Sequence, residues 1–348
     1  MYLVPPGSSA PLNTIYISIL AILLTLFVCS LFKKFPGADI LDVSNFLFGK
    51  WFKFIIGFLF IIYILLTSSI LLRDFCECLK IIYFKRTNIY FIVALFVLLA
   101  AFSNMSGEKS IIRSNILILP LILAGIIFIF LANIKNFVPQ RMFPLLGDGA
   151  NETFIIGTSN IYSYSCLFLI LFMPPFLKDT SKFKKIAVTS IVISAIYLIL
   201  CVFSLTFIFS FITQENGIMP IYLASRYIEF GTFFQRIDAI FLLLWISEVG
   251  LYLNIIVMIV LRILKKITCI ESSSSLVYPV CLLIFCFSLF PRNLADINTF
   301  DKTFYKNSTL YFVILTSVLI LILANIKNKL KNKNKEEILG WKTYFLLF

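Results

Sequence analysis

The chain has 348 residues, of which 60% are hydrophobic and 14% are charged, and its mean hydropathy is +1.00. Soluble domains contain about 45–50% apolar residues, so this composition excludes an ordinary soluble domain and predicts an all-α integral membrane protein. The net charge of +13 would indicate nucleic-acid binding in a soluble chain. Here the Lys and Arg residues cluster at the ends of apolar segments, so membrane topology explains them and we expect no nucleic-acid partner.

The composition also argues against catalysis. The chain contains no His, which removes the usual proton shuttle and the commonest metal ligand. Its eight Cys residues lie mostly within apolar runs and form no Cys-x-x-Cys pair, which indicates buried small side chains. The sequence has no HExxH motif, no phosphate-binding Gly-rich loop and no Ser/His or Cys/His pair. We therefore expect neither an enzyme nor a bound metal or cofactor.

The first ten residues, MYLVPPGSSA, are too short to cross a bilayer. Pro5, Pro6 and Gly7 would break a helix, because proline removes a hydrogen-bond donor and glycine loosens the backbone. We interpret this segment as the remnant of an interrupted first span, in which Val4, Pro5 and Gly7 face a ligand. The alternative is that both prolines lie in an N-terminal tail.

Nine full spans are predicted after this remnant. They cover residues 12–32, 51–72, 88–102, 111–132, 158–177, 186–211, 231–264, 277–290 and 308–326. Surface helices are predicted at 36–50 and from Pro220. If the first full span ends in the cytoplasm, most Lys and Arg residues lie on that side, as the positive-inside rule requires.

This topology divides the chain into a single transmembrane domain, residues 1–326, and a Lys-rich cytoplasmic tail, residues 327–348. Lysines close to a membrane surface are attracted to anionic lipid headgroups. We expect the tail to be solvated and to interact with such lipids, and binding to a partner protein is the alternative.

The segment at 158–177, TSNIYSYSCLFLILFMPPFL, is long enough to span a bilayer but is polar in its first half. Lipid cannot satisfy polar groups, so a half-polar span is expected to line a cavity. Tyr162, Ser163, Tyr164 and Ser165 are then candidate ligand-binding residues. The alternative is that the helix starts near Ser165 and the polar run is an outer loop.

Counting the remnant as span one makes this segment span six. Interrupted segments at matching places in two halves indicate a transporter-like 5+5 inverted-repeat helical bundle. The half-helix ends of such a fold expose main-chain amides, which attract a carboxylate, and carbonyls, which attract a cation. We expect an amino-acid-sized site between spans one and six.

Four further residues are assigned to this site or its surroundings. Glu248 is the only acid deep within a span, and burial of a carboxylate in hydrocarbon is costly, so it is expected to face the bundle. Trp245 and Tyr252 share its helical face. Glu248 would hold an ammonium group or a coupling cation, or it is a neutral acid bonded to another helix. Ser69 is expected to reach the cavity, one turn before an Arg73–Glu77 ion pair.

Several motifs, in their order and spacing, resemble those of the spore germination permease family. They are FPGADILD (35–42), LFGKW (47–51), SGEKSIIR (106–113), PLLGDG (144–149) and the run from 236 to 245. The proteins of this family are the B subunits of germinant receptors and are related to amino acid/polyamine/organocation transporters. Members usually begin with an entire first span, whereas here Met1 falls inside it.

The resemblance implies a membrane subunit of a germinant receptor that binds a small nutrient, expected to be an amino acid, and triggers germination. It implies a second membrane subunit and a lipoprotein as partners, in the spore inner membrane. Two alternatives remain. One is a secondary amino-acid transporter coupled to a proton or cation at Glu248, and the other is a scaffold subunit that binds no ligand.

Overall fold

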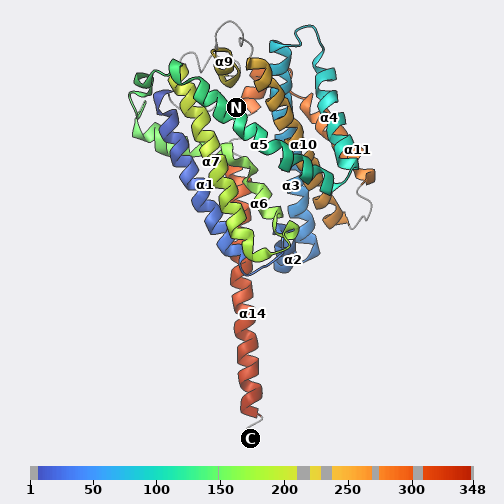
Figure 1. Ribbon diagram of the computed structural model, residues 1–348. Coiled ribbons are helices and arrows are strands. Elements are labelled where there is room, and N and C mark those ends of the chain that lie inside the picture. The colour runs from blue at the N-terminus through green and yellow to red at the C-terminus, as the bar shows by residue number, and fades with distance from the viewer. Residues whose placement is uncertain are drawn as a thin grey trace.

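The computed structural model describes residues 7–147, 149–209, 220–228, 237–268, 274–300 and 309–345. Within these ranges the chain is a bundle of helices without strands, so the predicted all-α class is confirmed. Figure 1 shows long helices that run side by side, with α9 at one end of the bundle and α2 at the other, the end from which α14 projects.

The helices of the first half are η1 (Gly7–Ser9), α1 (Ala10–Phe32), α2 (Ile40–Phe48), α3 (Lys50–Ile82), α4 (Ile89–Met105), α5 (Glu108–Ala132), η2 (Ile134–Asn136) and η3 (Pro139–Met142). The second half contains η4 (Asn151–Ile155), η5 (Ile156–Leu167), α6 (Phe168–Phe172), η6 (Pro174–Phe176), η7 (Thr180–Lys182), α7 (Phe183–Ile208), α9 (Pro220–Arg226), α10 (Ile237–Thr268), α11 (Ser274–Ser288), α12 (Leu294–Phe300), η9 (Thr309–Thr316) and α14 (Ser317–Phe345).

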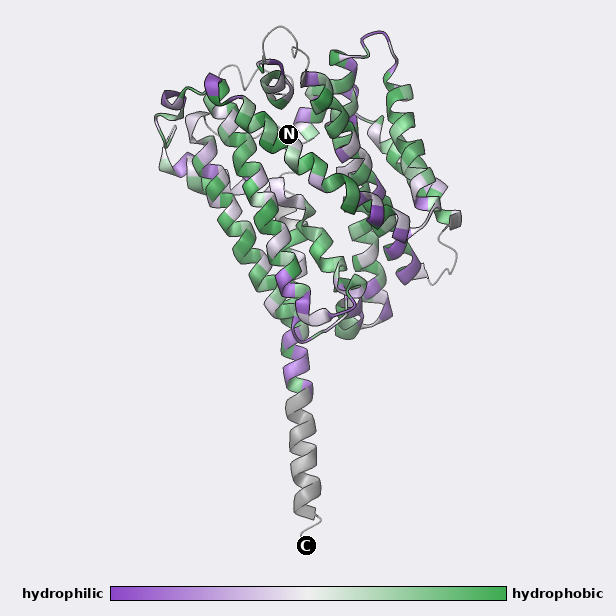
Figure 2. Cartoon of the chain, in the orientation of Figure 1, coloured by the Kyte–Doolittle hydropathy of each residue, from purple (hydrophilic) through white to green (hydrophobic). Residues whose placement is uncertain are grey.

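Seven of the described segments are long and apolar enough to cross a membrane, and two shorter apolar helices, Ile89–Met105 and Ser275–Ser288, accompany them. Figure 2 shows that hydrophobic residues dominate the bundle, while hydrophilic ones gather toward the helix ends. Each segment overlaps one predicted span, so the chain is a multi-pass membrane protein. The count of nine spans and the inverted-repeat relation between the halves stay predictions, as does the division at residue 326.

The predicted span 158–177 is not a continuous α-helix. The π-helix η4 precedes it, its first half is the 3-10 helix η5, and it becomes α-helical only in the five residues of α6. Tyr164 interrupts it with non-helical backbone angles (φ −101°, ψ 27°), and Pro174 ends α6. The predicted interruption of this segment is therefore confirmed, and its polar half is helical rather than a loop.

One predicted boundary is wrong. The span expected at 51–72 continues as α3 to Ile82, so that Arg73 and Glu77 lie within the helix and not at its end. The helix continues because these two charges neutralise each other, with the guanidinium and carboxylate 2.8 Å apart. At about 1.5 Å per residue, α3 is roughly 50 Å long, well beyond a ~30 Å hydrocarbon core.

The predicted surface helix at 36–50 is α2. Asp39 caps its N-terminus by accepting hydrogen bonds from the backbone of Leu41 and Asp42, and Asp42 completes a capping box. The apolar side chains Ile40, Leu41 and Leu47 are buried, because α2 packs on α3 and α14. Protein, rather than lipid, therefore covers its apolar face.

Candidate functional site

The irregular segment η4–η5 is attached to α1 through buried amides. Asn13 of α1 donates from Nδ2 to the carbonyl of Thr153 at 2.8 Å and accepts from Asn160 Nδ2 at 2.8 Å. Both asparagines are 0% exposed. Gly157 permits this approach, because a Cβ atom there would lie 2.2 Å from Asn13 Nδ2. Asn13 and Asn160 were not predicted as site residues, although an amide within each of these two segments was a visible signal.

Two hydroxyl contacts continue this interface along α1. Ser18 and Tyr164 place their hydroxyl oxygens 2.7 Å apart, and Tyr16 and Thr158 place theirs 3.2 Å apart. Ser18 and Tyr164 are almost fully buried. The polar face of η5 is therefore turned into the protein, as a half-polar span requires.

The four candidate residues of this segment lie together but differ in environment. Tyr162, Tyr164 and Ser165 are each about 95% buried. Ser163 is half-buried, and its Oγ atom is buried without a hydrogen-bond partner in the described part of the chain. Of the N-terminal candidates, Gly7 begins η1, whereas Val4 and Pro5 lie outside the described residues.

Glu248 of α10 faces this segment. It is half-buried and interacts electrostatically with Cys166 of η5 and with Tyr197 and Cys201 of α7. Cys166 is an exposed residue of η5. The structure thus brings Glu248 within electrostatic range of the interrupted span.

The remaining candidates lie in helix contacts. Trp245 packs on Phe75 of α3 with ring centroids 4.3 Å apart and on Phe241 at 6.1 Å. Tyr252 is partly buried against the main core. Ser69 donates to the carbonyl of Ile284 in α11 at 3.2 Å. The hydroxyl of Ser69 therefore joins α3 to α11. Its partner is a residue of α11 and does not belong to the group around Glu248.

The predicted Arg73–Glu77 ion pair is confirmed, and it also joins two helices. Arg73 is 4% exposed and donates from Nε and Nη2 to one oxygen of Glu77 at 3.1 and 2.8 Å. Its Nη1 lies 3.4 Å from the carbonyl of Ser288, at the end of α11, and Nη2 lies 3.3 Å from that of Arg292. The guanidinium therefore caps α11 with positive charge, which the helix dipole favours.

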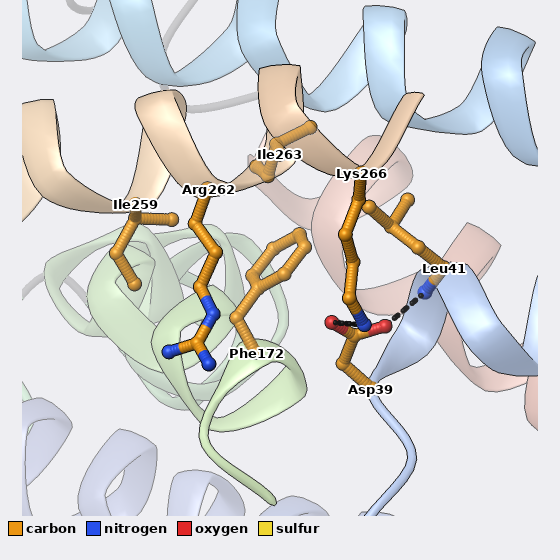
Figure 3. A pocket seen from close by; sticks show the side chains of 7 residues that line it. All are labelled: Asp39, Leu41, Phe172, Ile259, Arg262, Ile263 and Lys266. Atoms are coloured by element: carbon orange, nitrogen blue, oxygen red, sulfur yellow. Dashed lines mark hydrogen bonds and ion pairs between the residues drawn. The ribbon is translucent and has the colours of Figure 1, made fainter. Parts of the chain in front are cut away.

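A second cluster lies between α2, η6 and the end of α10, around the crevice drawn in Figure 3. Lys266 Nζ contacts Asp39 at 2.5 Å and Asp42 at 2.7 Å. Arg262 stacks on the ring of Phe176 at 3.7 Å and lies 4.0 Å from Glu108 of α5. Lys266 and Arg262 thus connect α10 to α2, η6 and α5.

The two acids around Lys266 respond oppositely to this environment. Burial raises the pKa of Asp39 above its usual value, although the hydrogen bond from Lys266 opposes it. Burial also acts to raise the pKa of Asp42, but the hydrogen bond and charge of Lys266 outweigh it, so that the pKa of Asp42 is lowered. This cluster was not predicted, because the sequence separates Asp39 from Lys266 by more than 200 residues.

An apolar bundle with one irregular, polar span defines the class: a multi-pass membrane protein with a transporter-like helical bundle. A family model described as "Spore germination protein" matches residues 10–297. The match covers most of the chain, which therefore belongs to the spore germination protein family, as its motifs predicted. Membership of this family supports a role in germination.

Three curated relatives agree with this assignment. Spore germination protein YndE of Bacillus subtilis (strain 168) is 21% identical over 89% of this chain and 85% of its own length. Spore germination protein A2 of the same organism is 23% identical over 82% and 78%, respectively. Spore germination protein GerQB of Bacillus cereus is 23% identical over 91% and 87%.

Proposed function

We propose that the chain is the nutrient-binding membrane subunit of a germinant receptor and acts by binding rather than by catalysis. The observation that carries this proposal is the family match over residues 10–297. The interrupted span supports it, since η5 presents buried polar groups next to Glu248. A small zwitterion fits such a site, because an anionic and a cationic group can both be paired there without lipid contact.

Binding would trigger germination through a difference in affinity. A ligand shifts a conformational equilibrium only by as much as it prefers one state over the other. The interfaces of η5 with α1 and of α10 with α2 are where we expect the two states to differ. We propose further receptor subunits, among them a second membrane protein and a lipoprotein, as the recipients of the signal in the spore inner membrane.

The test of this function is germination of a deletion strain across a nutrient panel. We expect loss of the response to one nutrient or a small group of amino acids, with restoration by the intact gene. A deletion strain that responds normally to every nutrient would contradict the proposal.

A second candidate function is a secondary transporter, favoured by the position of Glu248 beside the interrupted span. Uptake of labelled amino acids into vesicles separates the two functions. Transport predicts uptake that Glu248→Gln abolishes, whereas sensing predicts no uptake together with loss of germination. A scaffold subunit predicts neither uptake nor a variant-dependent nutrient response.

A further inference from the structure

Two hydrogen-bond acceptors on η5 have no partner within the described residues. They are Oδ1 of Asn160 and Oγ of Ser163, and both atoms are buried. Buried polar atoms in proteins are almost always paired, and in a membrane the surroundings supply no water to compensate. Two unpaired atoms, three residues apart, therefore point to a group that binds between them.

The orientation of the Asn160 amide follows from its neighbours. Asn13 donates from Nδ2 to a carbonyl, that of Thr153, which can only accept. The other end of the Asn13 amide is therefore Oδ1, and it must receive a donor from Asn160. The Nδ2 atom of Asn160 is used in this contact, so the atom left unpaired is an oxygen that can only accept.

The helix type aligns the two acceptors. Residues i and i+3 eclipse in a 3-10 helix, with a rise of about 6 Å between them. Asn160 and Ser163 both lie in η5 before the interruption at Tyr164, so their side chains leave the helix on one face. A donor atom between the two acceptors, at a hydrogen-bond distance of about 2.9 Å from each, would bridge this rise of about 6 Å.

The charge nearby decides what kind of donor fits. Cys166 follows by a further three residues and interacts electrostatically with Glu248. Among the described residues, the groups within electrostatic range of Glu248 are Cys166, Tyr197 and Cys201, and none of them is a cation. A group that carries several N–H donors and a positive charge satisfies the two acceptors and also balances the carboxylate.

We propose that Asn160 and Ser163 form the subsite for the primary ammonium group of the nutrient, with Glu248 as the counter-charge. This inference rests on the proposed function and assigns one end of the ligand to named atoms. It predicts that the ligand must carry a free amino group. It also predicts that the Oγ atom of Ser163 contributes to affinity although it contributes no bond to the fold.

The test is thermal unfolding of the purified full-length protein in detergent, titrated with each standard amino acid. For every amino acid that raises the Tm, its N-acetyl derivative is titrated as well. We expect at least one amino acid to stabilise the wild type and its N-acetyl derivative to have no effect. Ser163→Ala is expected to unfold at the wild-type temperature without ligand and to bind the amino acid at least tenfold more weakly.

Ser159→Ala is the matched control, because Ser159 is half-buried on the same helix, as Ser163 is, but its hydroxyl already donates to the carbonyl of Ile156. Its titration is expected to match that of the wild type. Asn160→Leu is a second variant, expected to lose the ligand-induced shift.

Three outcomes would contradict the ammonium subsite without contradicting nutrient binding elsewhere in the protein. They are an unchanged titration of Ser163→Ala, equal stabilisation by the N-acetyl derivative, and a Ser163-dependent shift produced by sodium or potassium chloride alone. If no amino acid stabilises the wild type, the proposed function fails together with the subsite.

Discussion

Lys266 pairs with two carboxylates that differ greatly in exposure. The side chain of Asp39 is 3% exposed and that of Asp42 is 41% exposed. Lys266→Met would leave Asp39 buried without its cation, and removal of one partner of a buried pair costs about 3 kcal/mol. We expect a lower Tm for this variant and partial recovery in Lys266→Met/Asp39→Asn, since asparagine still caps α2. A double variant no more stable than the single one would show that charge burial is not the cause.

The pKa of Asp42 predicts a dependence of stability on pH. A carboxyl whose pKa is lower in the folded state stabilises the fold above its unfolded pKa of about 3.9. This contribution disappears as the pH falls through the folded pKa. Asp39, with a raised pKa, acts in the opposite sense, so the comparison must isolate Asp42.

We therefore expect the Tm difference between wild type and Asp42→Asn to be largest near neutral pH and to shrink below about pH 4. Thermal unfolding of both proteins between pH 3.5 and 7 measures it. A difference that stays constant over this range would mean that Asp42 acts only through its capping bonds.

Gly157 lies where η5 approaches Asn13 of α1 closely. In Gly157→Ala the new methyl group would displace Asn13 and break its buried bonds to Thr153 and Asn160. A buried polar group left unpaired costs about 1–3 kcal/mol, so we expect a clearly lower Tm. Gly250→Ala in α10 is the control, because no atom lies within 4 Å of its Cβ position. Equal behaviour of the two variants would argue against a specific steric contact.

At the scale of elements, one guanidinium joins α3 to the end of α11. Arg73→Met would leave Glu77 buried and would remove the cap from the end of α11. We expect a loss of about 3 kcal/mol, with part of it recovered in Arg73→Met/Glu77→Gln. Thermal unfolding measures the stability, and limited proteolysis near Ser288 reports whether the end of α11 loosens. A single variant as stable as the wild type would show that the pair contributes nothing net.

The spans were predictable because length and apolar content alone decide whether a segment can cross a bilayer. The interruption of the segment at 158–177 was predictable for a related reason, since hydroxyls and two prolines contradict a regular lipid-facing helix. The continuation of α3 beyond Leu72 was not, because it depends on a charge pair that becomes tolerable only when α11 packs against it. On a hydropathy scale, Arg73 and Glu77 mark the end of an apolar span. The scale scores each residue separately and cannot represent the ion pair between them.

The candidate site was predictable only in part. Residue type and spacing indicated Tyr162 to Ser165 and Glu248, and the structure places Glu248 near this segment. The same reasoning could not find the Asn13–Asn160 contact or the Lys266 cluster, since each joins segments more than 100 residues apart in sequence. Pairing of distant residues is a property of the packed bundle and not of any local pattern.

At the scale of the whole molecule, α2 connects the C-terminal end of α10 with α14. Its N-terminal acids hold Lys266, and its C-terminal carbonyls at Phe46 and Leu47 accept from Lys327 of α14. Figure 1 shows α2 at the end of the bundle where α14 emerges. A change at Glu248 that moved α10 would therefore act on α2 and α14, which gives the proposed receptor a route from its ligand to its partners.

The most direct test of nutrient sensing is the germination dose–response of a deletion strain that carries wild-type, Ser163→Ala or Glu248→Gln protein at equal abundance. We predict that both variants need at least tenfold more of the nutrient for a half-maximal response, while responses to nutrients that do not require this protein are unchanged. Dose–response curves that superimpose on the wild type would contradict a nutrient site at the interrupted span.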